Sequence, residues 1–299
     1  MILMLEKLVT EQRNKDTLHL DQMSVKDILL TMNQEDQRVP GIIHEVIPHI
    51  ESAVKLVIQS FQSGGRLIYA GAGTSGRLGV LDAVECKPTF GVSDEMVKGV
   101  IAGGEQAFTQ AVEGAEDNER SGMDDAISLQ ITSNDTVIAL AASGRTPYAI
   151  GLLKKATELG ANTVSISCNK NSSMSKYAQV AIEAETGPEI LTGSTRLKAG
   201  TAQKLILNMI STTAMIGIGK VYQNLMVDMQ PTNEKLVARS KRMIMEATDA
   251  DLETATKALH DANGQVKTAI VMILLQCSYE EATKTLSKNR GFVRQATKK

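Results

Sequence analysis

The chain has 299 residues, of which 42% are apolar and 22% charged, and its formal net charge at pH 7 is −2. These proportions are typical of globular proteins, and the length suits one large α/β domain with a smaller one. A near-neutral chain with no Trp and 3% aromatic residues is unlike proteins that hold nucleic acid through charge or base stacking. We therefore expect no nucleic-acid partner.

The cysteines and the apolar runs indicate the compartment. Cys86, Cys168 and Cys277 are far apart and odd in number, which fits a reducing cytoplasm and excludes the spacing of a zinc finger. The N-terminus has a short apolar run and an early Glu6, unlike a signal peptide. No apolar run approaches the roughly 18 residues that a membrane-spanning helix needs. We expect a cytoplasmic protein without a membrane partner.

The first 63 residues are expected to be helical. Ser24 and Asp27 resemble a capping box with Asp in place of Glu, which predicts a helix from residue 25. After Pro40, apolar residues recur with a period close to 3.6. This spacing predicts one long amphipathic helix that ends at Ser63-Gly64-Gly65.

Five strand-like runs follow, and each is succeeded by a helical pattern. This alternation predicts an α/β fold in which helices cover both faces of a five-stranded parallel sheet. The runs are Leu67–Ala70, Val97–Ala102, Thr136–Ala141, Asn162–Ser167 and Val180–Ala184. Two of these helices are expected at 149–159 and 198–219.

The C-terminal part is expected to form a small helical domain. Pro231-Thr232-Asn233 breaks the pattern, and helices are predicted at about 234–246, 249–262, 264–275 and 278–288. The basic tail from Arg290 is expected to be frayed. The predicted division is therefore N-terminal helices at 1–63, a sheet domain at 64–235 and a helical domain at 236–299.

A glycine-rich turn, Gly71-Ala72-Gly73-Thr74-Ser75-Gly76, connects the first strand to a helix. Backbone N–H groups in such a turn approach an anion closely, and the N-terminus of the helix adds positive potential. Thr74 and Ser75 add hydroxyl donors. The turn therefore predicts a phosphate site.

Two better-known glycine motifs fit this turn less well. A dinucleotide site needs an acid at the end of the second strand, but two glycines separate Ile101-Ala102 from Glu105. A P-loop needs Lys and Ser or Thr where this chain has Arg77 and Leu78, so the residue that would bind Mg²⁺ is missing.

A second hydroxyl-rich loop, Ser143-Gly144-Arg145-Thr146, follows the third strand. If the strand order is 2-1-3-4-5, as in flavodoxin-like folds, the loops after strands one and three flank the switch point where ligands bind. Two such turns suit a phosphomonoester, and Ser194 and Thr195, after the fifth strand, belong to the same expected binding set. The alternative is that these small polar residues only cap helices.

Carboxylates are the candidate acids and bases, because the four histidines lie outside the strand-end loops. Glu85 has the uncharged neighbours Ala83, Val84 and Cys86, so burial could raise its pKa. Glu116 lies in an acidic run whose alternative explanation is a solvated helix face. Two buried carboxylates with separated pKa values would suit proton transfer near pH 7. The cysteines have no basic neighbours and are interpreted as structural.

Several motifs together resemble the N-acetylmuramic acid 6-phosphate etherases, a family built on a sugar isomerase (SIS) domain. The motifs are TEQRN near the N-terminus, TSGRLGxLDAxECxPTFG, AxEGAED, SGRTPY, GSTRLKAGTAQK and NLMVDMQPTNEKL. They cover about residues 8–245. The glucokinase regulatory protein is a larger relative of this family, so the length favours the enzyme.

The resemblance implies a carbon–oxygen lyase of cell-wall recycling. Such an enzyme cleaves the D-lactyl ether of N-acetylmuramic acid 6-phosphate with water, by elimination and then hydration. The resemblance places the two catalytic glutamates at Glu85 and Glu116, and it implies a homodimer without metal or organic cofactor. Lys87 stands where the family is expected to have a small or apolar residue, which affects the local electrostatics.

Two alternatives remain open at this point. An aldose–ketose phosphosugar isomerase of the same domain type would also remove the C2 proton, but it would release no lactate. A non-catalytic sugar-phosphate regulator would bind the sugar phosphate without exchanging that proton. Between the glutamates, the apolar neighbours of Glu85 favour it as the acid that protonates the leaving group, with Glu116 as the base.

Overall fold

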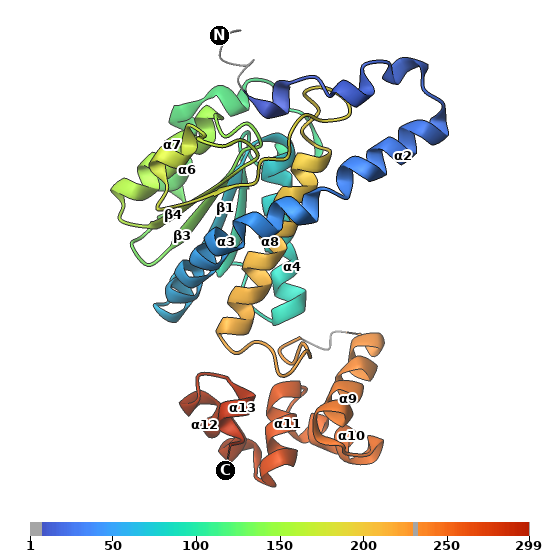
Figure 1. Cartoon of the computed structure of the whole chain (residues 1–299). Helices are drawn as coiled ribbons and strands as arrows, with labels where there is room; N and C mark the ends of the chain where they lie inside the picture. Colours follow the sequence, from blue (N-terminus) through green and yellow to red (C-terminus); the bar gives the residue numbers. More distant parts are fainter. Residues whose placement is uncertain (1–7, 230–232, 299) are drawn as a thin grey trace. The chain divides into compact units, whose positions relative to one another are not determined.

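The computed structural model describes residues 8–229 and 233–298 (Figure 1). The predicted break at Pro231-Thr232 and the apolar run with Glu6 lie outside these ranges. The described chain divides into two compact units. The first contains the residues up to Val84 together with Asp94–Ser211, and the second contains Glu85–Ser93 and the residues from Thr212 onward. These bounds differ from the predicted divisions at 64 and 236.

The first unit contains a five-stranded parallel sheet in the order β2-β1-β3-β4-β5. The fold class and the strand order are as predicted, and every predicted strand is confirmed to within one residue. β1 and β3 are buried at every position, as expected of central strands covered on both faces. The strands are β1 (Leu67–Gly71), β2 (Val97–Ile101), β3 (Thr136–Leu140), β4 (Asn162–Ser167) and β5 (Val180–Glu183).

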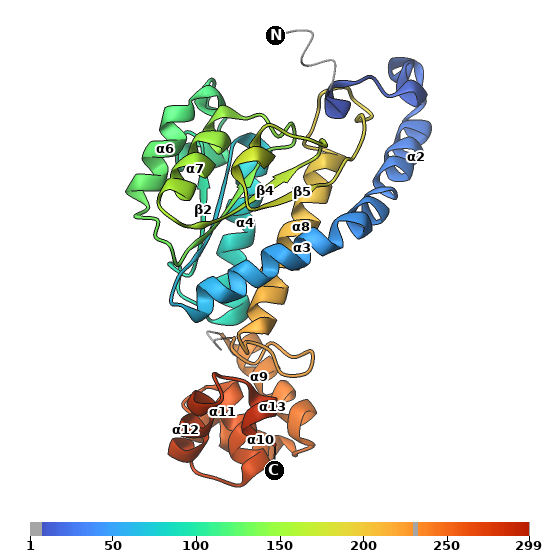
Figure 2. The ribbon, with the colours of Figure 1, turned by 60° about the vertical axis from the view of Figure 1, so that its left-hand side comes forward.

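Helices lie on both faces of this sheet (Figure 2). Ile68 and Ala70 of β1 join the apolar cluster that holds Tyr148 and Leu152, whereas Tyr69 points the other way, where it meets Gly79. This alternation is the period of two that a strand imposes. The helices that begin in this unit are α2 (Val25–Asp36), α3 (Val39–Gln62), α4 (Gly73–Phe90), α5 (Gln106–Thr109), α6 (Glu119–Ser128), α7 (Pro147–Glu158) and α8 (Lys198–Gly217).

Short 3₁₀ helices complete the first unit, and the predicted N-terminal helices are present. Ser24 caps α2 by accepting a hydrogen bond from the backbone N–H of Asp27, as predicted. The long helix expected after Pro40 is α3, which continues through an internal Pro48. The 3₁₀ helices are η1 (Val9–Glu11), η2 (Lys15–Thr17), η3 (Leu20–Gln22), η4 (Ala115–Asp117) and η5 (Met174–Tyr177).

The second unit has its own apolar core, which contains Ile244, Ile270 and Val271. Its helices are α9 (Glu234–Thr248), α10 (Leu252–Asp261), α11 (Val266–Leu275), α12 (Tyr279–Lys288) and α13 (Val293–Ala296). The expectation of a frayed tail is wrong for α13. Val293 and Ala296 are 1% and 6% exposed because both side chains pack into this core.

In the described part of the chain, no helix has the length and apolarity to cross a membrane.

Candidate functional site

The loops after β1 and β3 start side by side, because Gly71 and Leu140 are paired in register at the ends of adjacent strands. The loop after β1 leads into α4, and the loop after β3 leads into α7. This is the switch point at which ligands bind in open parallel sheets. The two candidate phosphate loops therefore lie at one end of the sheet, as predicted.

The turn after β1 is as tight as its glycines suggest. A Cβ on Gly76 would lie 2.6 Å from the carbonyl oxygen of Gly71, and Gly73 begins α4 with a φ of +52°. A bulkier residue at Gly76 would force this turn open. The N–H groups of the first turn of α4 have no carbonyl partner within their own helix, so this end of α4 suits an anion.

Ser75 and Gln203 form a buried pair beneath this turn. The Ser75 hydroxyl donates to Gln203 Oε1 at 2.9 Å, and the two residues are 8% and 1% exposed. The other end of the amide, Gln203 Nε2, has no hydrogen-bond partner among the described residues. A buried N–H without an acceptor is costly. Sequence reasoning missed Gln203, which lies 128 positions from Ser75.

The loop after β3 is held by its neighbour after β4. Gly144 has a φ of +67°, and a Cβ there would lie 2.3 Å from Ser172 Cβ. The carbonyl of Gly144 accepts from the N–H of Met174 at 3.0 Å. Ser143 Oγ accepts from the N–H of Arg145 at 3.3 Å, and the side chain of Thr146 makes no capping bond to α7. The backbone of this loop is therefore held in place by hydrogen bonds. The Thr146 hydroxyl is not used to cap α7.

The loop before α8 reaches the same end of the sheet. A Cβ on Gly200 would lie 3.6 Å from both Thr195 O and Thr74 Cγ2, so Thr74 and Thr195 flank the start of α8. Ala142, Cys168 and Ala199 form a buried cluster that joins this start to the loop after β3. The structure thus brings the predicted Ser194-Thr195 segment close to the turn after β1.

The first turn of α8 already holds a carboxylate of the protein. Glu189, 1% exposed, accepts from the N–H groups of Lys198 at 3.1 Å and Ala199 at 2.9 Å. Burial raises the pKa of Glu189, and these two N–H groups partly oppose that rise. Lys198 is buried too, and its ammonium group pairs with Glu35 of α2, which also binds Arg38 at 3.0 Å. The N-terminus of α4 is therefore the better candidate for an external anion.

The N-terminal segment braces these loops. Asn169, just after β4, donates to Ala142 O and to Thr10 Oγ1, both at 3.0 Å. Its Oδ1 accepts from the N–H of Val9 at 2.8 Å. Thr17 Oγ1 donates to the carbonyl of Ile190 at 2.8 Å. The TEQRN stretch thus has a structural role beside the candidate site that its sequence did not reveal.

The two predicted catalytic glutamates are both exposed in this chain. Glu85, on α4, belongs to the second unit and Glu116, in η4, to the first. The expectation that apolar neighbours bury Glu85 is wrong. The helical period turns Ala83 and Cys86 inward, whereas Val84 is 63% exposed on the same side as Glu85.

Arg77 has a different role from the one its place in the turn suggests. Its guanidinium donates to the carbonyls of Ala107 at 2.9 Å, Phe108 at 2.9 Å and Gln110 at 3.1 Å. It therefore fixes the segment that leads from β2 toward Glu116. Three backbone carbonyls around one guanidinium hold this segment in one geometry.

Among the described residues, neither the thiol of Cys168 nor a cluster of possible metal ligands adds reactive chemistry near these loops. Burial raises the pKa of the Cys168 thiol to about 12, so Cys168 is protonated near neutral pH and is structural, as predicted. Over residues 8–229 and 233–298, His, Cys, Asp and Glu side chains form no group of three that could hold a metal ion.

Two family models match parts of the chain: the N-terminal SIS domain of the glucokinase regulatory protein over residues 49–157, and the SIS domain over residues 113–212. A solved phosphoheptose isomerase from Neisseria gonorrhoeae is 13% identical, with a TM-score of 0.49 over 64% of this chain and 98% of that chain.

Curated relatives match over almost the whole length. The N-acetylmuramic acid 6-phosphate etherase of Shouchella clausii is 71% identical, covering 99% of this chain and 100% of that protein. The etherase of a Geobacillus species is 65% identical, covering 98% of this chain and 99% of that protein. The chain therefore belongs to the N-acetylmuramic acid 6-phosphate etherase family.

Proposed function

We propose that this chain cleaves the D-lactyl ether of N-acetylmuramic acid 6-phosphate with water, giving N-acetylglucosamine 6-phosphate and D-lactate. The observation that carries the proposal is the 71% identity to a named etherase over 99% of the chain. The activity is that of a carbon–oxygen lyase in cell-wall recycling, and the three free cysteines are compatible with a reducing cytoplasm.

The C6 phosphate binds at the N-terminus of α4. Thr74, Ser75 and Gly76 form one wall of this site, and Ser143-Gly144-Arg145-Thr146 and Ser194-Thr195 form the others. Support comes from the convergence of the three loops at one end of the sheet. Binding the phosphate holds the sugar at a point remote from the reacting carbons, so its binding energy helps to position the substrate.

Gln203 positions Ser75 for this phosphate. In the structure the Ser75 hydroxyl donates to Gln203 Oε1, while Gln203 Nε2 has no partner among the described residues. Turning the amide over places Nε2 as a donor to Ser75 Oγ. The Ser75 O–H is then released to donate to a phosphate oxygen, and the buried N–H gains an acceptor while Gln203 Oε1 gives up its donor.

Proton transfers account for the reaction. Opening of the sugar ring gives an aldehyde at C1, which acidifies the proton on C2. Glu116 removes this proton, the C3–O bond breaks, and Glu85 protonates the departing lactate oxygen. Water then adds at C3 of the unsaturated aldehyde and loses a proton to the Glu85 carboxylate, while C2 regains a proton from Glu116. Two carboxylates exchange all the protons that these steps require.

A homodimer supplies the burial that the glutamates lack in one chain. Glu85 and Glu116 are exposed here, and water at an exposed carboxylate weakens its use as a general acid. Exposed apolar side chains on α2 offer surface for a second copy: Val25, Leu29 and Leu30 are 75%, 60% and 58% exposed.

Lactate release is the test of this function. The purified chain is incubated with N-acetylmuramic acid 6-phosphate, and D-lactate is measured enzymatically. An etherase releases one lactate for each sugar phosphate consumed. A phosphosugar isomerase or a non-catalytic regulator would release none, and that result would overturn the proposal.

A further inference from the structure

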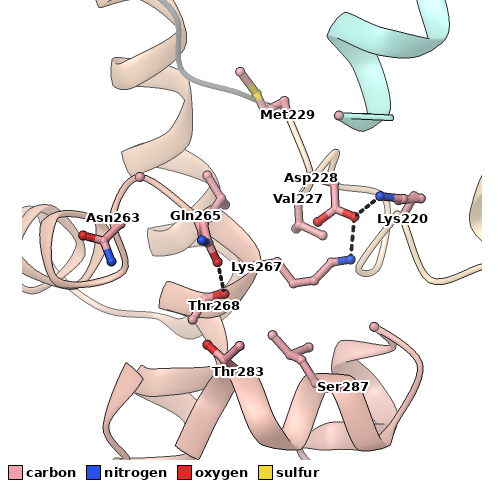
Figure 3. Close-up of a pocket in the computed structure, with 15 residues that line it drawn as sticks. Lys220, Val227, Asp228, Met229, Asn263, Gln265, Lys267, Thr268, Thr283 and Ser287 are labelled. Carbon is pink, nitrogen blue, oxygen red and sulfur yellow. Dashed lines mark hydrogen bonds and ion pairs between the residues drawn. The ribbon is translucent and has the colours of Figure 1, made fainter. Parts of the chain in front are cut away.

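The second unit contains a cavity of about 570 Å³. It lies between the segment before α9, the start of α11 and the side of α12 (Figure 3). Val227, Met229 and Leu286 give it an apolar part, and Asn263, Thr283 and Ser287 give it polar groups. The volume falls in the range of small-molecule pockets, roughly 300–1,000 Å³. The sheet-end loops contribute no residue to this cavity.

Its charged lining consists of two lysines and one aspartate, Lys220, Lys267 and Asp228. Both ammonium groups share the same carboxylate oxygen, Asp228 Oδ2, at 3.2 Å for Lys220 and 2.6 Å for Lys267 (Figure 3). One carboxylate cannot neutralise two ammonium groups, so the lining has an excess of one positive charge.

The two lysines are held differently. Lys267 donates to the carbonyl of Gly219 at 2.8 Å as well as to Asp228, and its side chain is 12% exposed. Burial lowers the pKa of Lys267, and Asp228 opposes that change. Lys220 is 24% exposed, and its ion pair with Asp228 occupies one of its three N–H donors. Lys267 therefore anchors the cluster, and Lys220 can still donate to a second oxyanion.

The geometry points to a binding site for a small organic oxyanion, a phosphate monoester or carboxylate on a polar body, in this cavity. Lys220 pairs with the oxyanion, Asn263 and Ser287 contact polar groups of the body, and Met229 lies against its apolar part. The site shares no residue with the proposed phosphate loops and does not depend on the proposed reaction.

The methyl group of Met229 provides a local reporter, because Met229 lines the cavity and is 4% exposed. The full chain is labelled with ¹³C at its methionine methyls, and the Met229 signal is assigned with Met229→Leu. The probes are N-acetylglucosamine 6-phosphate, D-lactate and inorganic phosphate, each up to about 10 mM, with neutral N-acetylglucosamine as the reference.

We expect the Met229 signal to shift in a saturable way with the sugar phosphate, with lactate or with both, but not with the neutral sugar. The responding probe identifies the charged group. Lys220→Gln should weaken this response about tenfold or more, as expected for a hydrogen bond to a charged group. Lys284→Gln removes the same charge from α12 outside the lining and should leave it unchanged.

Ser287→Phe is an independent test, because it fills the cavity and leaves both lysines in place. It should abolish the Met229 response, whether or not Lys220→Gln disturbs the ion cluster. Ser143→Ala, at the proposed phosphate loop, should leave the response intact, so a failure of the proposed function remains distinguishable. If Met229 responds to none of the three anions, or responds equally in Lys220→Gln and in the unchanged chain, the inference is wrong.

Discussion

Replacing Gln203 by Met should reduce function while leaving stability nearly unchanged. The substitution keeps the length of the side chain and removes a buried amide. Loss of the 2.9 Å hydrogen bond leaves the buried Ser75 hydroxyl without its acceptor, which costs about 1–3 kcal/mol. Removal of the unpaired Nε2 group stabilises the folded chain by relieving a desolvation penalty of about 1–3 kcal/mol. These effects oppose each other, so the free energy of unfolding should change by no more than about 2 kcal/mol.

The effect on substrate should be much larger. Without the Gln203 amide as a hydrogen-bond partner, the Ser75 hydroxyl is no longer oriented toward the phosphate. A lost hydrogen bond to a charged group corresponds to about tenfold or more in KM, with a smaller change in kcat because the phosphate is remote from C2 and C3. Lactate release at varied substrate concentration measures both constants, and urea denaturation measures the stability.

Asn208→Leu is the matched control on the same helix. The Asn208 amide donates to Asp82 Oδ1 at 2.7 Å, so its loss should destabilise the chain by about 1.5–3 kcal/mol and leave KM unchanged. If Gln203→Met instead unfolds more easily by more than about 2 kcal/mol and keeps its KM, the amide is an ordinary structural group and the argument about Ser75 is refuted.

Three further predictions follow from the site and the sheet. In deuterium oxide the product should carry deuterium at C2; Glu116→Gln should abolish this exchange together with lactate release, whereas Glu85→Gln should slow release about 10²–10⁴-fold and keep some exchange. The opposite pattern reverses the two roles, and near-normal release by both variants excludes the carboxylate mechanism. Ser143→Ala should weaken phosphosugar binding about tenfold to a hundredfold in calorimetry, and unchanged affinity would argue against this loop. Asp135→Asn should destabilise the chain by about 3 kcal/mol in urea denaturation, because Asp135 pairs with Arg66 at 2.8 Å and is 1% exposed.

The pH dependence of that last variant has a defined sign. Burial tends to raise the pKa of Asp135, but hydrogen bonds from Arg66 and Thr132 outweigh it, so the pKa in the folded chain lies below the ordinary value of 3.8. The stabilisation is therefore present above pH 3.8 and is lost as the pH falls toward the lowered pKa. Asp135→Asn should flatten the acid side of the stability curve, and an unchanged acid side would contradict this assignment.

The sequence predicted the sheet well because apolar strands and glycine stops are local signals. Both ends of Asn162–Ser167 match, and the order β2-β1-β3-β4-β5 is the one assumed for the switch point. The loops with Thr74 and Ser143 lie together for the same reason, since adjacent parallel strands end at one edge. Local sequence patterns were sufficient to predict these strands and turns, because each is determined by residues that are close in sequence.

The contacts that shape the candidate site were not predictable in this way. Gln203 meets Ser75 across 128 positions, and Lys198 meets Glu35 across 163. No local sequence pattern predicts contacts between residues so far apart in the chain. The exposure of Glu85 was also missed, because apolar neighbours in sequence say little until the buried face of the helix is known. Arg77 directly follows the glycine turn in sequence, but its guanidinium donates to carbonyls about thirty positions further along.

The buried Lys198–Glu35 pair limits how the chain can be shortened. Residues 1–38 precede α3, the long helix that packs on the sheet, and are the natural segment to shorten. Such a deletion would take away the carboxylate and leave an ammonium group, 2% exposed in the intact chain, without its counterion. Loss of one partner from a buried pair costs about 3–5 kcal/mol, a large part of the stability of an ordinary domain. A cut after Glu35 removes the carboxylate of this pair, so a stably folded fragment should begin before Glu35.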